Sequence, residues 1–133
     1  MPVRISSDLL DAIIADADTT EMEVCGLLFG TGNAITARQP CRNVALDART
    51  AFEIDPTALI AAHRAARTGG PAIIGCYHSH PSGSAQPSAR DAVDAAPDGT
   101  LWLVVARAGV GLWRSVAKGE WQGRFDPVAL IRD

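Results

Sequence analysis

The length, composition and charge of the chain indicate one folded domain over residues 1–133 and exclude several classes of protein. Of the 133 residues, 47% are hydrophobic and 20% are charged, which supports a packed core and excludes a disordered chain. The net charge of −3, without a basic block, argues against nucleic-acid binding. No apolar run approaches the roughly 20 residues that cross a bilayer. The N-terminus lacks a signal peptide's apolar stretch, and three scattered cysteines favour reduced thiols, so we expect a cytoplasmic protein.

The first half of the chain alternates helical and strand patterns. Apolar residues recur at helical spacing after the capping hydroxyl of Ser6, and continuous apolar runs bounded by Gly and Asn indicate buried strands. Pro56 is placed to begin a second helix, and Gly69 and Gly70 to end it. In chain order, the predicted elements are a helix over 8–18, strands over 24–30, 34–41 and 51–54, and a helix over 57–67.

The second half begins with a buried strand and ends in an antiparallel meander. The expected elements are a strand over 72–78, a Pro-, Gly- and Ser-rich loop over 79–87, a helix from Ser88 to about Pro97, and strands over 101–106, 110–116 and 121–125. Short loops containing Gly connect the last three strands, as in β-hairpins. Each of these strands carries one tryptophan, and we expect the three rings to pack together or to line one face of the sheet. The sequence therefore predicts an α/β domain with a mixed β-sheet flanked by helices.

Two of the three histidines form the most informative pattern. His78 and His80 are two residues apart, so on an extended strand their imidazoles face the same side. Asp91 follows on the predicted first turn of a helix, from which its carboxylate can return to the two rings. Two imidazoles and one carboxylate are a common catalytic zinc set, and they leave the fourth tetrahedral position open for water.

The same residues also have structural explanations. A His-x-His pair alone is more often a loop feature than a pair of metal ligands, and Ser88 with Asp91 matches a helix N-terminal cap. The cap is compatible with a metal-binding role for Asp91. The third histidine, His63, is expected to be exposed on the second helix.

The gapped pattern as a whole resembles a known family motif. The segment that runs His78-Ser79-His80-Pro81 and continues to Ser88 and Asp91, together with an upstream Glu23-Val-Cys-Gly-Leu-Leu, is similar to the JAMM motif of JAB/MPN zinc metallopeptidases. The resemblance covers nearly the whole chain. It implies the MPN fold, with an architecture close to that of cytidine deaminases, although the deaminase signature itself is absent.

The resemblance also implies a role for each motif residue. His78, His80 and Asp91 would bind one Zn²⁺ per chain, Glu23 would handle the proton of the water, and Ser88 would stabilise the oxyanion. The residue types suit these roles, because zinc-bound water still needs a base and a hydroxyl is able to donate to a developing oxyanion. Glu21 is the alternative base if the register differs.

The family relationship implies hydrolysis of an amide bond, with a small β-grasp protein as partner. The expected substrate is a ubiquitin-like or sulfur-carrier protein cut after a C-terminal Gly-Gly, whose extended tail would pair with an exposed sheet edge. Three alternatives stay open: a small-molecule amide conjugate, a function like that of the RadC relatives tied to DNA metabolism, and a zinc-bound interaction module with little turnover. RadC-like proteins usually carry Asn where this chain has Ser79.

Overall fold

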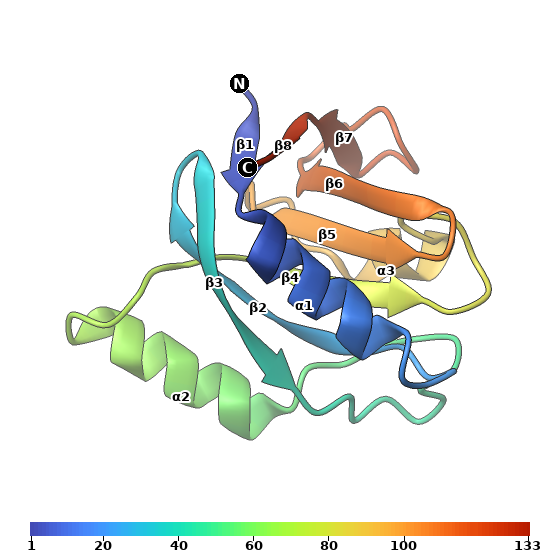
Figure 1. The fold of residues 1–133 in the computed structure, drawn as a ribbon, viewed down its shortest axis with the longest axis horizontal. Helices are drawn as coiled ribbons and strands as arrows, with labels where there is room; N and C mark the ends of the chain where they lie inside the picture. The colour runs from blue at the N-terminus through green and yellow to red at the C-terminus, as the bar shows by residue number, and fades with distance from the viewer.

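An eight-stranded mixed β-sheet organises the chain in the computed structural model, which describes residues 1–133 (Figure 1). Three helices accompany it: α1 (Ser7–Ala17), α2 (Pro56–Arg67) and α3 (Ala89–Asp94). The strands are β1 (Val3–Ile5), β2 (Cys25–Thr31), β3 (Ala34–Cys41), β4 (Ile73–His80), β5 (Leu101–Ala106), β6 (Gly109–Ser115), β7 (Phe125–Val128) and β8 (Leu130–Arg132). No helix is both long and apolar enough to span a membrane.

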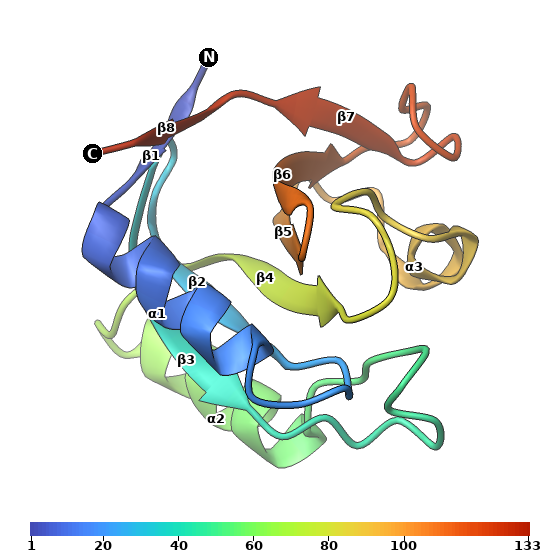
Figure 2. The same cartoon turned by 45° about the vertical axis from the view of Figure 1, so that its right-hand side comes forward.

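The order of the strands makes the sheet curl. The order is β7-β6-β5-β4-β2-β3-β1-β8, and β7 and β8, at opposite ends of the order, are separated in the chain by Ala129 alone. The two ends of the sheet therefore meet along one stretch of chain, as Figure 2 shows. Strand β4 is central: it pairs antiparallel with β2 and parallel with β5.

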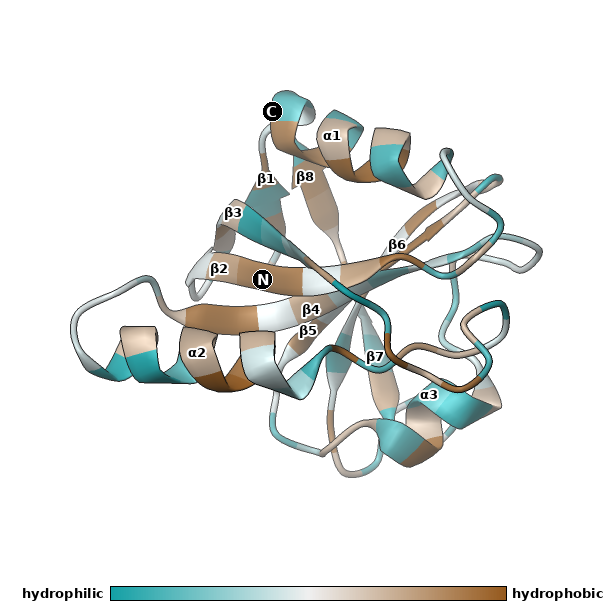
Figure 3. Cartoon of the chain, turned by 90° about the horizontal axis from the view of Figure 1, so that it is seen from below, coloured by the Kyte–Doolittle hydropathy of each residue, from teal (hydrophilic) through white to brown (hydrophobic).

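The two faces of the sheet carry different helices. Figure 3 shows α1 on one face and α2 on the other. Leu59 and Ala62 of α2 pack in a small cluster with Leu27 and Phe29 of β2. Leu10 and Ile13 of α1 pack with Tyr77 of β4 in the largest core cluster. Since side chains alternate along a strand, His78 points to the opposite face, where Trp102 and Phe125 form a second cluster beside α3.

The sequence predicted the fold class and most elements correctly. The helix over 8–18, the strands over 24–30 and 34–41, and the helix over 57–67 agree with the structure within a few residues. His63 is exposed on α2 as expected. The three tryptophans do pack into one cluster, with the rings of Trp113 and Trp121 6.0 Å apart.

Several predicted boundaries were wrong for identifiable reasons. The strand expected over 72–78 continues to His80, because Ser79 and His80 pair with Val105 and Ala106 of β5 despite their polar side chains. The segment 51–54 forms only an isolated bridge, between Ile54 and Asn43, and Trp121 only a bridge to Phe125. The third helix ends at Asp94 rather than near Pro97. The last meander strand is Phe125–Val128, and the three-residue strands β1 and β8 are too short to show a periodicity.

The close approach of β4 and β5 yields the first prediction. A Cβ at Gly75 would collide with the Leu101 carbonyl oxygen, a backbone atom that cannot move without breaking the pairing, whereas Gly32 has nothing within 4 Å. We expect Gly75→Ala to lower the free energy of unfolding by about 1–3 kcal/mol or more, and the control Gly32→Ala to change it little. Urea denaturation followed by circular dichroism measures both; equal stabilities would contradict this account of the β4–β5 contact.

Candidate metal centre

Three side-chain atoms converge at the carboxyl end of β4. The Nε2 atoms of His78 and His80 are 3.0 Å apart, and Oδ2 of Asp91 lies 3.0 Å from the first and 3.2 Å from the second. His78 is fully buried, Asp91 is 4% exposed and His80 is 9% exposed. The three residues that the sequence pattern singled out thus place three side-chain atoms within 3.2 Å of one another.

Strand pairing and one hydroxyl position the two histidines. Pairing holds β4 on both sides up to His78, and β5 continues to pair with it through His80. Between the histidines, Ser79 points to the other face of the sheet. Its Oγ accepts from Val24 N at 2.8 Å, and its own N–H donates to the Val24 carbonyl at 3.0 Å. These bonds fix the segment that carries Glu23 against the segment that carries the imidazoles.

Asp91 is held by the helix cap predicted from the sequence. Ser88 Oγ accepts from Asp91 N at 3.0 Å, and Asp91 Oδ2 accepts from Ser88 N at 2.9 Å, which completes a capping box. The oxygen that faces the imidazoles is therefore the one held by the cap. The hydroxyl of Ser88 uses its oxygen in this bond, so its hydrogen stays available to donate elsewhere.

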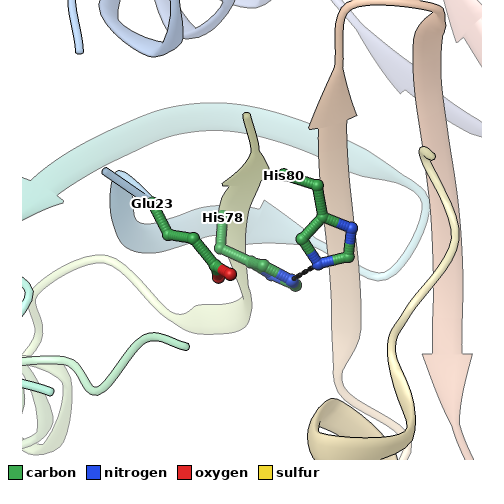
Figure 4. A group of neighbouring side chains, drawn as sticks. All are labelled: Glu23, His78 and His80. Carbon is green, nitrogen blue, oxygen red and sulfur yellow. Dashed lines mark hydrogen bonds between the residues drawn. The ribbon is translucent and has the colours of Figure 1, made fainter. Parts of the chain in front are cut away.

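Glu23 completes the cluster from the start of β2. Its side chain is 6% exposed, and one ligand atom each from Glu23, His78 and His80 lie within 4.8 Å of one another; Figure 4 shows the carboxylate directed toward the His78 ring. Oε1 of Glu23 is buried and has no hydrogen-bond partner. By contrast, the alternative Glu21 is exposed and lies outside the cluster.

The segment between β3 and α2 holds Glu23 in place through Asn43. Its side-chain amide donates to the carbonyls of Glu23 (2.9 Å) and Ala51 (3.1 Å), and its Oδ1 accepts from Ala45 N and Glu53 N. The backbone N–H of Glu23 also donates to a carbonyl of this segment, that of Ala48, at 2.7 Å. Sequence reasoning missed Asn43, because its partners are distant in the chain.

Burial and charge set the protonation states of the cluster. Burial raises the pKa of Glu23 to about 7; the nearby His80 opposes this, and Asp91 adds to it. Burial lowers the pKa of His78 against the opposing effect of Asp91, which favours a neutral imidazole. Burial also opposes charge on Asp91, but hydrogen bonds from both histidines outweigh it and hold the Asp91 pKa well below its usual range.

The contacts of His80 require a positive charge at its Nε2 atom. Its Nδ1 lies 2.8 Å from the Ser84 carbonyl, which only an N–H can satisfy, so in the neutral ring Nε2 carries a lone pair. That lone pair faces the negatively charged Asp91 oxygen at 3.2 Å. The arrangement is favourable only with a positive charge there. Hydrogen bonds that the His80 ring donates to Asp91 and Ser84 raise the pKa of His80, although burial, the largest single effect, lowers it. A proton supplies this charge in a metal-free protein, and a metal ion would supply it otherwise.

The donor set fits a zinc ion. Tetrahedral zinc with bonds of about 2.0–2.1 Å separates its ligand atoms by about 3.3–3.4 Å, and the 3.0–3.2 Å triangle needs to open by only a few tenths of an ångström to match. The Ser84 contact is the kind of outer hydrogen bond that orients a histidine ligand. His78 Nδ1, in contrast, is buried without a partner.

Aromatic rings orient His78 in place of such a bond. Phe52 stacks on the imidazole with centroids 4.3 Å apart, and Trp102 meets its edge at 5.7 Å. Phe52 was read from the sequence only as part of a short strand. Nothing local in the sequence indicated the contact, since it joins the segment after β3 to β4.

Two indole N–H groups fasten the loop that follows His80. Trp113 Nε1 donates to the Ala85 carbonyl at 3.1 Å, and Trp121 Nε1 donates to the Pro87 carbonyl at 2.7 Å. Gly111 leaves room for the first of these carbonyls, because a Cβ there would collide with it. The sequence predicted that the rings pack, but not that they anchor the residue before Ser88.

The chain belongs to the prokaryotic branch of the JAB domain family. The family model for prokaryotic homologs of the JAB domain matches residues 6–118. The chain is 32% identical to a desampylase of Haloferax volcanii over 91% of its own length and 88% of the relative's. A desampylase of Pyrococcus furiosus is 30% identical over 79% of this chain and 74% of the relative.

Further similarities are more partial or concern the fold alone. A Thermus thermophilus protein named "Probable TtuB-protein conjugate cleaving protease" is 43% identical over 42% of this chain and 38% of its own. A solution structure from Salinibacter ruber has a TM-score of 0.68 at 27% identity and covers 98% of this chain and 92% of its own. A JAB1/MPN domain protein from Archaeoglobus fulgidus superposes with a TM-score of 0.58 at 19% identity, each chain being 98% covered.

Anchoring of the loop by Trp121 yields the second prediction. Trp121→Phe keeps an aromatic ring but removes the donor to Pro87, so we expect faster amide hydrogen exchange at Ser88 and Asp91 and a loss of about 1 kcal/mol in stability. Trp102→Phe is the matched control, because Trp102 belongs to the same cluster and its indole makes no hydrogen bond to the loop. Equal exchange at these two amides in both variants would refute the anchoring role.

Proposed function

We propose that the protein is a zinc-dependent isopeptidase that hydrolyses the amide bond after the Gly-Gly terminus of a ubiquitin-like or sulfur-carrier protein. The observation that carries this proposal is the buried triangle of His78, His80 and Asp91 with Glu23 beside it. The names of the relatives support the substrate class, since two are desampylases and one is a protease for protein conjugates.

His78, His80 and Asp91 are the proposed zinc ligands, with Glu23 outside the set. Asp91 Oδ2 already lies 3.0–3.2 Å from both ring nitrogens and is fixed by the cap. Glu23 oxygen atoms lie within 4.8 Å of the ring nitrogens but are not fixed by a side-chain hydrogen bond. Three ligands from the first set leave room for a water molecule that Glu23 reaches.

Each proposed catalytic residue has a task that its position allows. Bound zinc supplies hydroxide at neutral pH by lowering the pKa of its water from 15.7 toward about 7. Glu23 accepts the proton of the attacking water on its carboxylate and returns it to the leaving nitrogen as the C–N bond breaks. Ser88 donates its free O–H to the developing oxyanion while its oxygen still caps α3.

An apolar groove beside His78 suits the acyl side of the substrate. This acyl-side groove, of about 640 Å³, is lined by Leu46, Phe52, Leu59, Trp102 and neighbouring residues. The backbone N–H and C=O of Phe52 bond to no other protein group, so they are available to an extended tail. A Gly-Gly sequence places no side chain between this backbone and the metal.

Pairing of the tail with an exposed sheet edge stays a prediction. The histidine strand is not such an edge over most of its length, because residues 73–78 of β4 pair with β2 and residues 75–80 with β5, and the sheet ends with β7 and β8. The irregular segment 45–54, which lines the acyl-side groove, offers further backbone beside the metal centre. Strand order is a property of the whole fold, which explains why local patterns did not reveal it.

The third prediction separates metal binding from chemistry. We expect one zinc per chain by elemental analysis, loss of most of it in His78→Ala and Asp91→Ala, and full retention in Glu23→Gln with hydrolysis reduced by several orders of magnitude. Ser88→Ala should retain zinc, slow hydrolysis about 10²–10³-fold and cost about 1 kcal/mol through the lost cap. Loss of zinc from the Glu23→Gln variant, or full hydrolytic activity of that variant, would overturn these assignments.

The fourth prediction concerns the substrate. Mass spectrometry over time should show cleavage of a β-grasp carrier extended beyond Gly-Gly, strong suppression when the last Gly is replaced by Val, and no cleavage of casein. A branched side chain at that position collides where only backbone fits. Equal cleavage of all three proteins would indicate a general peptidase, and zinc-bound protein that cuts none would favour the small-molecule amide.

A further inference from the structure

A second hollow is lined by the loop that follows His80. This arginine hollow, of about 620 Å³, is lined by Glu21, Arg49, Thr50, the loop 81–83, Arg107 and Ala108. Pro81 directly follows the ligand His80, and Thr50 also lines the acyl-side groove. The two hollows therefore adjoin along the segment between β3 and α2, which Figure 2 shows beside the end of β4.

The position of the metal centre assigns one hollow to each side of the scissile bond. The His78 ring lies against Phe52 and Trp102, which line the acyl-side groove, whereas His80 lies against the loop of the arginine hollow, with Gly83 next to its Cβ. Because groove residues contact His78 and a hollow residue lies beside His80, we infer that a chain running from one hollow to the other passes the histidine pair. If the tail occupies the apolar groove, the leaving amine enters the arginine hollow.

The two arginines of this hollow have no partners. Four other arginines (Arg4, Arg38, Arg90 and Arg132) each pair with an aspartate, and two more (Arg114 and Arg124) donate to carbonyls. The remaining three (Arg42, Arg64 and Arg67) also lack a partner, but none of them lines this hollow. Arg49 and Arg107, 58 positions apart in the chain, line the same cavity and form no ion pair or side-chain hydrogen bond. Glu21 is the only acidic residue in the lining, so positive charge exceeds negative charge within the lining of this hollow, in a chain of net charge −3.

We propose that Arg49 and Arg107 recognise a carboxylate on the leaving group, within a residue or two of the scissile nitrogen. Guanidinium groups bind carboxylates through paired N–H donors, and seven of the eight lining residues are not hydrophobic. This inference rests on the proposed function and narrows it: the preferred substrate carries one or two extra residues that end in a free α-carboxylate, or an acidic side chain at that place. Hydrolysis adds water across the C–N bond and releases the amine with its carboxylate.

The test compares carriers that differ only in this charge. Three semisynthetic carriers end in Gly-Gly-Ala with a free acid, Gly-Gly-Ala with a carboxamide, and Gly-Gly-Asp with a carboxamide. We expect wild-type zinc enzyme to favour the free acid over the Ala carboxamide by about 5- to 30-fold in kcat/KM, as two partly exposed ion pairs allow. Cleavage of the Asp carboxamide at the rate of the free acid would show that either carboxylate is recognised; cleavage at the rate of the Ala carboxamide would assign recognition to the α-carboxylate alone.

Variants that remove a positive charge or a negative charge from the hollow make the test specific. Arg49→Gln and Arg107→Gln should each move the acid-to-amide ratio toward one, Glu21→Gln should raise it, and Arg64→Gln, an exposed arginine on α2 outside the hollow, should retain the wild-type ratio. A wild-type ratio within about twofold of one, or arginine variants with the wild-type ratio, would overturn the inference.

Measurements of carrier binding distinguish failure of this inference from failure of the proposed function. Dissociation constants of the acid and amide carriers, measured on zinc-loaded Glu23→Gln, report carboxylate recognition without turnover. Tighter binding of the acid carrier that Arg107→Gln abolishes supports the inference even if wild type cleaves none of the carriers, which would count against the proposed function alone. Equal binding of acid and amide carriers overturns the inference whatever the activity.

Discussion

The site depends on the burial of three electron-rich atoms within 3.2 Å of one another. Lone pairs of two imidazoles and a carboxylate repel at this distance in an environment of low dielectric, unless a cation lies among them. The surrounding structure is built to keep the atoms together. Central placement of β4, the cap of α3 and the stacked ring of Phe52 each restrain one of the three residues.

The helix cap links stability to chemistry. Asp91 Oδ2 accepts from Ser88 N and also faces both histidines, so a change at Ser88 disturbs the helix start and the proposed ligand together. The same coupling extends to the loop before Ser88, whose carbonyls accept from Trp113 and Trp121. The strands that follow the motif in the chain thus help to position it.

The sequence predicted those parts of the site that depend on local geometry. His78 and His80 share a face because strand side chains alternate, and Asp91 returns to them because it occupies the third position after a serine cap. It could not reveal contacts that depend on the whole fold. Asn43, Phe52 and the indole donors act on residues 20 or more positions away, and no periodicity or spacing records such pairs.

The two hollows differ in character, and this difference defines an orientation for a substrate at the metal centre. The groove on the His78 side is largely apolar and offers unpaired backbone, whereas the hollow on the His80 side is polar and carries two arginines. An amide substrate would therefore bind in one orientation only. Both hollows depend on the segment between β3 and α2, which Asn43 ties to the backbone of Glu23.

The most direct test of the central claim is a crystal structure of the zinc-loaded protein, with the metal located by anomalous scattering. The account predicts zinc about 2.0–2.2 Å from Nε2 of His78, Nε2 of His80 and a carboxylate oxygen of Asp91, with Glu23 separated from the metal by one water molecule. Zinc bound directly by Glu23, with Asp91 only capping α3, would contradict it.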